Sequence, residues 1–325
     1  MSKAIRIHET GGPEVLKWED VKVNAPGLGE AKVRHTAVGL NYIDIYGRTG
    51  LHPMPSFPHT LGMEAAGVVE AIGEGVNGIA VGDRIAYVIA PPGAYSEERV
   101  VPADRLIKLP EGVSDETGAA MMLKGMTAQY LLHQTYTVKA GDSILIHAAA
   151  GGVGLIVCQW AKHLGAKVIG TVGNDEKAAL AKAYGCDHTI VYTQENFKER
   201  VSEITGGEGV DVVYDSIGKE TFTDSLDSLK PLGMMVTFGN ATGPIDPFSP
   251  SILAAKGSLF VTRPTIFTYI AKRDNLIAMA ADLFKVVSSG VVKIQINQTY
   301  DLSNAAQAHI DLEARKTTGS TILKP

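Results

Sequence analysis

The sequence predicts a two-domain α/β protein, in which an irregular β-rich domain accompanies a doubly wound parallel sheet. Its 325 residues exceed what one hydrophobic core usually organises, and a single α/β barrel is the main alternative. Residues 1–110 contain short β-like runs, whereas six apolar runs alternate with amphipathic stretches from residue 142 to 263. Continuous apolar runs are typical of parallel strands that helices cover on both faces.

The β-rich segment comes first along the chain. Its runs include KAIRIHE, EAKVRHTAVGL, AAGVVEAIG and RIAYVI, which GGP, APGLG, GEGVNG and PPG separate. Residues 114–134 then have helical spacing, with Ser114 as the N-cap and acidic residues in the first turn. We expect this helix to carry the chain across a domain boundary.

The parallel sheet is predicted from the runs SILIHA, KVIGTV, HTIVY, VDVVYDSI, MMVTFGN and SLFVTR. The stretch that follows, residues 265–290, predicts one long helix. Beyond it the sequence ends in a strand-like stretch, STILKP, which we expect to return to the first domain.

Composition argues against several classes of function. A net charge of −5 and a pI near 6.0 argue against binding to nucleic acid or to anionic membranes. No apolar run reaches the ~20 residues of a spanning helix, and MSKAIRIHET is unlike a signal peptide, so we expect a soluble, cytoplasmic protein. Cys158 and Cys186 lack metal-ligand spacing, and we expect them to be packing residues.

A glycine turn follows the first strand of the predicted parallel sheet. In HAAAGGVG, Ala149, Gly151 and Gly154 take the three small-residue positions of a G-x-G-x-x-G fingerprint. The helix that it opens, ending near Gly165, would offer its N-terminal N–H groups to a pyrophosphate. A tight turn without a ligand is the alternative. The residues of this turn that we assign to a dinucleotide are Ala149, Gly151, Gly152, Val153 and Gly154.

The end of the second strand indicates which dinucleotide binds. NAD sites place an Asp or Glu there, whereas this chain has Val172 and Gly173, which leave room for a 2′-phosphate. Lys177 is the expected cation for that phosphate, unless it is only a solvated helix residue. Asp175 and Glu176 fit the helix N-terminus. NADPH is therefore favoured, with Gly173, Asn174, Lys177 and Tyr192 around its adenosine end.

The carboxyl ends of the later strands complete the expected cofactor crevice, because ligands of such sheets bind there. Asp215 is more consistent with a cap for the next helix than with a ligand contact. The residues assigned to the crevice are Ser216, Phe238, Gly239, Asn240, Val261, Thr262 and Arg263.

Several motifs in order give the whole chain a family resemblance. They include ETGGPEVLKWED, AVGLNYIDIYGRTGLHP, LGMEAAGVVEAIGEGV, GAYSEERVVPADRLIKLP, VYDSIGKETF and FGNATGP. The chain resembles the zinc-free medium-chain dehydrogenase/reductases, within them the quinone oxidoreductase (zeta-crystallin-like) group and its bacterial NADPH:quinone reductases. The resemblance implies a GroES-like catalytic domain from residues 1–124 and 266–325, a Rossmann NADPH-binding domain from 125–265, a cleft between them, and a homodimer.

Zinc-dependent relatives carry a Cys and a His where this chain has Asn41 and Met63. Because the amide is a poor zinc ligand and the thioether a soft one, we expect no metal. Glu64, which follows, is expected to be a buried structural carboxylate paired nearby.

The resemblance also assigns residues to the reaction. Asn41 and Tyr46 would line the nicotinamide side of the cleft and, with Arg263, act as catalytic residues; Thr127, Tyr130 and Arg315 would lie near the cofactor. Two alternatives stay open: Asn41 as a helix N-cap and Tyr46 as packing. Asp44 would cap or pair with Arg48.

The function that follows is NADPH-dependent reduction of a quinone, an activated acceptor that needs positioning more than a strong acid. An NADPH-dependent reductase of α,β-unsaturated carbonyls is the alternative enzyme. RNA binding is the alternative outside enzymes, which the acidic charge and the lack of a basic-aromatic motif disfavour.

Overall fold

The computed structural model describes residues 1–88 and 92–325, so the end of the predicted RIAYVI run and the start of PPG lie outside it. The chain divides into two compact units. The first contains Met1–Met126, Ile270–Phe284 and Ile294–Pro325, and we call it the catalytic unit after the role expected from the sequence. The second contains Thr127–Tyr269 and Lys285–Lys293, and we call it the nucleotide unit for the same reason.

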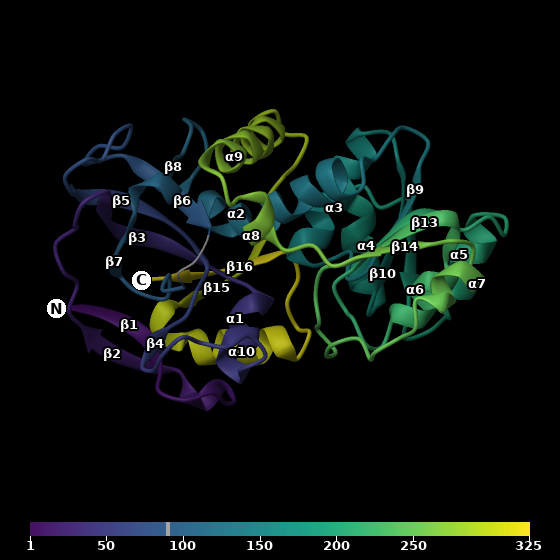
Figure 1. Cartoon of the computed structure of the whole chain (residues 1–325), viewed down its shortest axis with the longest axis horizontal. Helices are drawn as coiled ribbons and strands as arrows, with labels where there is room; N and C mark the ends of the chain where they lie inside the picture. The colour runs from purple at the N-terminus through teal and green to yellow at the C-terminus, as the bar shows by residue number, and fades with distance from the viewer. Residues whose placement is uncertain (89–91) are drawn as a thin grey trace. The chain divides into compact units, whose positions relative to one another are not determined.

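The catalytic unit is built on two sheets, which are visible in Figure 1. Three strands pair in the order β2-β1-β4, and a seven-stranded sheet has the order β15-β16-β3-β5-β6-β8, with β7 also paired to β3. The C-terminal strand β16 lies antiparallel to β3, which confirms that this segment returns to the first domain. The bounds are β1 Ser2–Ile7, β2 Lys17–Val21, β3 Glu30–Leu40, β4 His59–Thr60, β5 Glu64–Ile72, β6 Arg84–Val88, β7 Glu98–Pro102, β8 Ile107–Lys108, β15 Ile296–Asp301 and β16 Ser320–Lys324.

Helices precede, connect and follow these strands along the chain. The helix predicted from Ser114 is α2, Asp115–Tyr130, and Ser114 is its N-cap because its Oγ accepts the N–H of Thr117 at 3.1 Å. A π-helical segment, η3, continues it over Leu131–Thr135. The other bounds are α1 Tyr42–Thr49, α9 Arg273–Ser288, α10 Ala305–Glu313, and the short helices η1 Pro13–Val15, η2 Ala103–Arg105 and η4 Leu302–Asn304.

The core of the catalytic unit lies between its sheets and α10. Ile5, Ile7, Leu40 and Tyr95 are almost completely buried there, with residues of α10 such as Ala308. Along the first half of β3 buried side chains alternate with more accessible ones, as the period of two in a strand requires. This core fixes the loop after β3, from which α1 begins.

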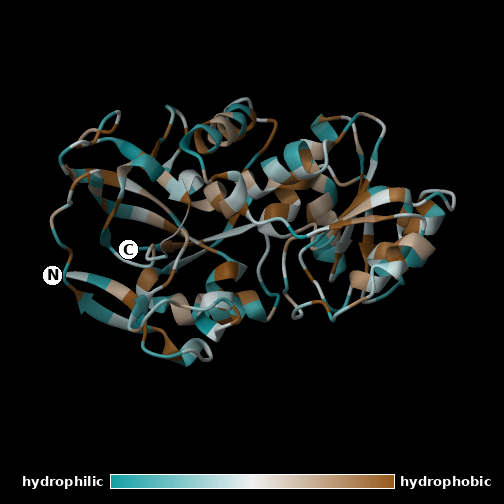
Figure 2. Ribbon diagram, viewed as in Figure 1, coloured by the Kyte–Doolittle hydropathy of each residue, from teal (hydrophilic) through white to brown (hydrophobic). Residues whose placement is uncertain are grey.

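The nucleotide unit contains the predicted parallel sheet. Its six strands are parallel in the order β11-β10-β9-β12-β13-β14, which confirms the doubly wound α/β fold. Helices α3 and α4 pack together along β9 to β11, and α5 and α6 pack together along β11 to β13. The strands are mostly brown in Figure 2, because helices cover them. The bounds are β9 Ser143–Ile146, β10 Lys167–Val172, β11 His188–Val191, β12 Val210–Asp215, β13 Leu229–Thr237, β14 Phe260–Thr262, α3 Gly152–His163, α4 Asp175–Ala183, α5 Phe197–Ile204, α6 Phe222–Asp227 and α7 Ser251–Ala255.

The single long helix predicted over residues 265–290 is wrong. The structure has a short α8, Ile266–Tyr269, and a separate α9 that begins at Arg273. Arg105 donates from Nη1 to the carbonyl oxygen of Ile270 at 3.1 Å, and Arg273 donates to the carbonyl oxygen of Asp104. These tertiary hydrogen bonds use the carbonyl of Ile270 and the side chain of Arg273, and a continuous helix would use that carbonyl within the helix. The tertiary bonds therefore override the helical propensity of the segment.

Both cysteines are buried, as expected for packing residues. Among residues 1–88 and 92–325, no helix combines the length and the apolar character needed to cross a membrane.

Candidate functional site

The glycine turn joins β9 to α3 in the nucleotide unit. Ala148 has φ = 54°, a left-handed conformation that costs energy for a side chain larger than glycine. The N–H of Ala149 donates to the carbonyl oxygen of Thr171 in β10 at 3.0 Å, and that of Gly151 to Ala148 at 2.8 Å. The turn is therefore held against the neighbouring strand, with the start of α3 directly behind it.

Gly154 and Gly151 are small for different reasons. A Cβ on Gly154 would lie 2.3 Å from the oxygen of Ala148 and 2.7 Å from Ala149, so the chain itself requires glycine there. At Gly151, φ is −80° and the nearest atom to such a Cβ, the Ala148 oxygen, is 3.1 Å away. The surrounding chain hinders a side chain at position 151 far less than at position 154. Glycine at 151 therefore fits a position where a ligand, and not the chain itself, needs the space. The first-turn N–H groups of α3 are not used by the helix itself and suit an anion.

The residues assigned to the 2′-phosphate lie at the ends of β10 and β11. A Cβ on Gly173 would lie 3.2 Å from the hydroxyl oxygen of Tyr192, whose side chain is 42% exposed. Asn174 is the N-cap of α4, because its Oδ1 accepts the N–H of Lys177 at 2.9 Å. Lys177 lies in the first turn of α4, as do Asp175 and Glu176.

The ends of β12 and β13 lie side by side, and β12 also pairs with β9, the strand that precedes the glycine turn. The carboxylate of Asp215 accepts the N–H groups of Ile217 at 2.6 Å and Gly218 at 3.1 Å, and the hydroxyl of Thr221 at 2.7 Å. The predicted helix cap is wrong, because these amides lie before α6, whose N-cap is Thr221; Asp215 holds the turn after β12 instead. A Cβ on Gly239 would lie 2.5 Å from the oxygen of Ser216. The structure thus brings together Ser216, Phe238, Gly239 and Asn240, with Val261 and Thr262 on the adjacent β14.

Arg263 belongs to a second cluster in the nucleotide unit. Its Nη1 donates to the carbonyl oxygen of Thr237 at 2.9 Å. Burial raises the pKa of Tyr130 well above its usual value, while a hydrogen bond with Thr127 and the charge of Arg263 oppose that rise. The ring of Tyr130 stacks on Tyr269 with centroids 4.5 Å apart. Thr127, Tyr130 and Arg263 therefore lie together, and Tyr269 is a member that sequence reasoning missed.

Asn41 precedes α1 in the catalytic unit. Its backbone N–H donates to Asp44 Oδ2 at 2.9 Å, so Asn41 does occupy the N-cap position. Its side-chain Nδ2 donates to Glu64 Oε1 at 2.7 Å. The carboxamide is only 5% exposed and is held on its nitrogen side.

Tyr46 lies one turn further along α1 and is 8% exposed. Its ring contacts those of Tyr42 and His52, with centroids 6.1 Å and 5.2 Å away. Apart from their closeness along the chain, no sequence pattern marks these two residues as neighbours of Tyr46. Tyr46 therefore belongs to an aromatic cluster at the buried face of α1.

Glu64 is fully buried and paired, as predicted. Its Oε1 also accepts from Lys124 Nζ at 2.9 Å, and its Oε2 accepts the N–H of Leu123 at 2.6 Å. Lys124 is 6% exposed and also donates to the carbonyl oxygen of Leu40. Sequence reasoning missed Lys124. No local pattern indicates that a lysine within an apolar helix pairs with a residue 60 positions earlier in the chain.

Asp44 caps α1 rather than pairing with Arg48. Its Oδ2 also accepts the hydroxyl of Tyr95 at 3.0 Å, and burial raises its pKa to about 7 against the hydrogen bonds from Asn41 and Tyr95. Arg48 instead donates to His309 Nδ1 at 3.1 Å and to Glu313 at 2.8 Å. The pairing alternative is wrong, because Arg48 points toward α10 and not toward the start of its own helix.

Arg315 follows α10 in the catalytic unit. It has φ = 58° and its N–H donates to the carbonyl oxygen of Leu312, so it terminates the helix in a left-handed conformation. Of the predicted site residues, Asn41, Tyr46 and Arg315 belong to the catalytic unit, and the others belong to the nucleotide unit.

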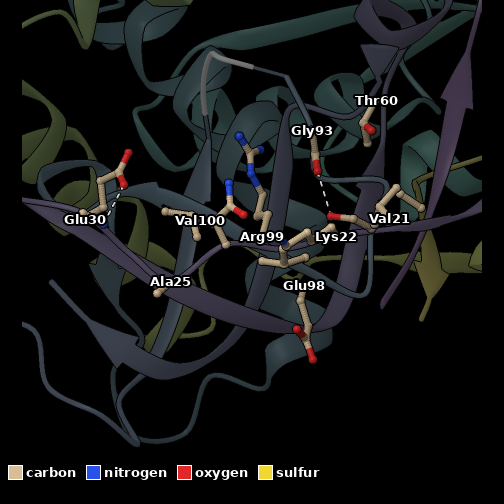
Figure 3. A pocket seen from close by; sticks show the side chains of 14 residues that line it. Val21, Lys22, Ala25, Glu30, Thr60, Gly93, Glu98, Arg99 and Val100 are labelled. Carbon is tan, nitrogen blue, oxygen red and sulfur yellow. Dashed lines mark hydrogen bonds between the residues drawn. The ribbon is translucent and has the colours of Figure 1, made fainter. Parts of the chain in front are cut away.

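A pocket of about 500 Å³ lies elsewhere in the catalytic unit. Figure 3 shows Arg99, Glu98 and Lys22 on its walls. In the part of the chain that the structure describes, its lining includes none of the residues predicted for the cofactor or the acceptor.

Comparison with known proteins gives this geometry a family. Residues 27–111 match the alcohol dehydrogenase GroES-like domain, and residues 152–283 match the zinc-binding dehydrogenase domain. A quinone oxidoreductase of Pseudomonas aeruginosa is 51% identical over 325 residues, which cover all of both chains. The chain belongs to the quinone oxidoreductase family of medium-chain dehydrogenase/reductases.

Other members are similar over the same length. The crystal structure of the Escherichia coli quinone oxidoreductase complexed with NADPH superposes with a TM-score of 0.98, at 47% identity, and the match covers 99% of this chain and 100% of that one. A 2-haloacrylate reductase of a Burkholderia species is 49% identical, with 100% of this chain and 99% of that protein covered.

The zinc that one of these family descriptions names does not fit this member of the quinone oxidoreductase family. Asn41 directs its Nδ2 at Glu64, and the ammonium of Lys124 already neutralises that carboxylate. A divalent cation placed there would meet an amide donor and a positive charge instead of thiolate and imidazole. No group of three or more His, Cys, Asp or Glu suited to a metal occurs among residues 1–88 and 92–325.

Proposed function

We propose that the protein is an NADPH-dependent quinone reductase that works without a metal. The similarity over the full length to quinone oxidoreductases, one of them solved with NADPH, carries the proposal. The geometry of the glycine turn supports it, because the chain itself hinders a side chain much less at position 151 than at 154, where a Cβ would lie 2.3 Å from a backbone oxygen.

The nucleotide unit would hold the cofactor. The first-turn N–H groups of α3, at 152–154, would face the pyrophosphate, and the absence of a carboxylate directly after β10 would leave Lys177 and Tyr192 to receive the 2′-phosphate. The ends of β12 to β14 and the cluster of Thr127, Tyr130 and Arg263 would orient the rest of the dinucleotide. Bound NADPH would supply the reducing equivalents.

The catalytic unit would hold the acceptor through Asn41 and Tyr46. A quinone is already electrophilic, so these residues have to orient its oxygen and to stabilise the negative charge that develops there. An amide N–H and a phenolic hydroxyl both do this as donors. Arg263 is proposed as the third catalytic residue, and Arg315 as a further contact to the cofactor.

One relative favours a second candidate. The 2-haloacrylate reductase acts, by its name, on an activated carbon–carbon double bond, and it is as similar to this chain as the quinone oxidoreductases are. Reduction of such a bond needs the same cofactor and a pocket of different shape. We therefore keep an NADPH-dependent enone or acrylate reductase as the alternative.

The decisive experiment compares acceptors at fixed NADPH. NADPH oxidation is followed with 1,4-benzoquinone or 1,2-naphthoquinone, and in parallel with 2-alkenals and 2-haloacrylate. We expect the highest kcat/KM with a quinone. The Gly151→Val variant, purified in the same way, controls for contaminating reductases and is expected to be inactive. A higher kcat/KM with the unsaturated acids or aldehydes would contradict the quinone reductase proposal and support the enone or acrylate reductase.

Three further properties are proposed from the family resemblance. They are a homodimer, a cytoplasmic location, and functional domains that consist of residues 1–124 with 266–325 and of residues 125–265. Analytical ultracentrifugation, fractionation of cells that produce the protein, and limited proteolysis test them in turn. The second candidate shares all three properties, so they do not separate the two activities.

A further inference from the structure

We propose that Lys124 and Glu64 are positioning residues for the reaction, which hold the carboxamide of Asn41 in one orientation. The inference rests on the proposed function, because it assigns a role to residues behind the proposed acceptor site. It starts from a buried group of three polar side chains, all within the catalytic unit.

The three side chains come from three different elements. Asn41 follows β3, Glu64 opens β5, and Lys124 lies in α2. As whole residues, Asn41, Glu64 and Lys124 are 5%, 0% and 6% exposed. The bonds run in one direction, from Lys124 Nζ to Glu64 Oε1 at 2.9 Å and from Asn41 Nδ2 to the same oxygen at 2.7 Å.

The backbone of β3 packs directly against the carboxylate of Glu64. A Cβ on Gly39 would lie 2.3 Å from Glu64 Oε1, so β3 approaches the carboxylate only because residue 39 has no side chain. The other oxygen of Glu64 accepts the N–H of Leu123 at 2.6 Å. The carboxylate of Glu64 thus accepts three hydrogen bonds, from Asn41, Leu123 and Lys124, and has little freedom to rotate.

This arrangement decides which end of the Asn41 amide faces inward. A carboxylate accepts and never donates when ionised, so it selects the nitrogen of the carboxamide and turns the oxygen away. Lys124 pairs with this carboxylate where both side chains are almost fully buried, so the carboxylate has a positive partner in a place that is largely closed to water. One hydrogen on Nδ2 is used by Glu64, and the second keeps a direction that the pair has fixed.

Stability alone explains the pair poorly. A buried ion pair usually contributes little net stability compared with well-packed apolar residues. A fixed donor, by contrast, has direct value at a reaction centre, where a misplacement of about 1 Å can cost on the order of 100-fold in rate. We therefore assign the pair to orientation of Asn41.

The test is a double-mutant cycle on quinone reduction. Lys124→Met is compared with wild type, and both are compared again in an Asn41→Ala background. We expect Lys124→Met to lower kcat roughly 10- to 100-fold with the Kd for NADPH unchanged, and to add less than about twofold once Asn41 is gone. Lys124→Arg is expected to restore part of kcat, because it keeps the charge. Equal losses of kcat in both backgrounds would overturn the inference.

Two controls keep the result interpretable. Glu64→Gln/Lys124→Met removes both charges together, so no unpaired charge is buried if the single variant fails to fold; it is expected to fold and still to lose kcat. Full kcat in this folded double variant would also refute the role. Lys108→Met breaks an exposed pair with Asp83 and is expected to act like wild type. If wild type itself does not reduce quinones, the proposed function fails, and this outcome is distinct from a failed cycle.

Discussion

Exchanging each of two glycines for alanine separates structural from ligand-related demands on the nucleotide turn. A Cβ at Gly154 would stand 2.3 Å from the Ala148 oxygen, which is about 1 Å short of an ordinary van der Waals contact. The neighbouring atoms, 2.7 Å away in Ala149, belong to backbone and cannot swing aside. The start of α3 must therefore move away from the turn.

The cost at Gly154 follows from this shift. Overpacking of this kind costs about 1–3 kcal/mol, and we expect Gly154→Ala to lower the free energy of unfolding by that amount. Because the same shift moves the first-turn N–H groups, the Kd for NADPH should rise as well, on the order of 10-fold or more.

Gly151→Ala is the matched partner. The added Cβ meets one oxygen at 3.1 Å and φ is −80°, so the free energy of unfolding should change by less than about 1 kcal/mol. NADPH binding should still weaken, because the methyl group stands where the backbone has to approach the pyrophosphate.

Urea unfolding and NADPH fluorescence titration measure both quantities on all three proteins. The reasoning predicts that Gly154→Ala loses stability and affinity, and that Gly151→Ala loses affinity alone. Unaltered NADPH affinity in Gly151→Ala, or equal destabilisation in the two variants, would refute it.

Three further predictions address the phosphate, the metal and pH. Lys177→Ala should raise the Kd for NADPH roughly 10- to 100-fold and leave that for NADH nearly unchanged, and equal losses in titrations of both would reject the phosphate role. Treatment with EDTA or 1,10-phenanthroline should leave kcat intact, whereas recovery of activity on adding zinc would contradict the assignment of Asn41 and Met63. The folded pKa of Asp44, about 7, lies above its usual value of 3.8, so the stabilisation from its protonated form is complete below pH 4 and is lost as pH rises through 7. Asp44→Asn should therefore reduce the change in the free energy of unfolding between pH 4 and 7, measured by urea unfolding, by up to about 4 kcal/mol, and an unchanged pH dependence would argue against the raised pKa.

Two histidines of the catalytic unit give the opposite pH dependence. Burial lowers the pKa of His35 to about 4 and that of His309 to about 3, where the charge of Arg48 adds to the effect. Their folded pKa values lie below the usual 6.5, so the stability linked to their neutral forms is present above pH 6.5 and is lost as pH falls toward 3. Measurements for Asp44 should therefore be read as differences between variant and wild type.

Local patterns predicted the nucleotide unit well. An apolar run marked each of its six strands, although β13 also contains the polar Lys230 and no residue of the edge strand β14 is fully buried. The turn was recognisable because Gly154 is required by contacts within seven residues of sequence. Asp215 was predicted to cap the next helix, whereas its amide partners two and three residues away belong to the turn before α6.

Long-range contacts limited the rest. The break between α8 and α9 depends on Arg105, which is 165 residues away from Ile270 in sequence. The pairing of Lys124 with Glu64 and the stacking of Tyr130 on Tyr269 likewise join distant segments. A local sequence pattern carries no information about partners that are distant in sequence. Glu64 could therefore be predicted to be paired, but Lys124 could not be predicted as its partner.

The place of β16 in its sheet has a consequence for how the protein is made. This strand is paired on both sides, with β15 and with β3, yet it follows the entire nucleotide unit in sequence. While the ribosome is still translating residues 320–324, the nascent nucleotide unit has all its strands and can fold, but β3 waits without one of its neighbours. Until β16 is made, the edge of β3 at Val38–Leu40 lacks this partner and is a template for pairing with other chains.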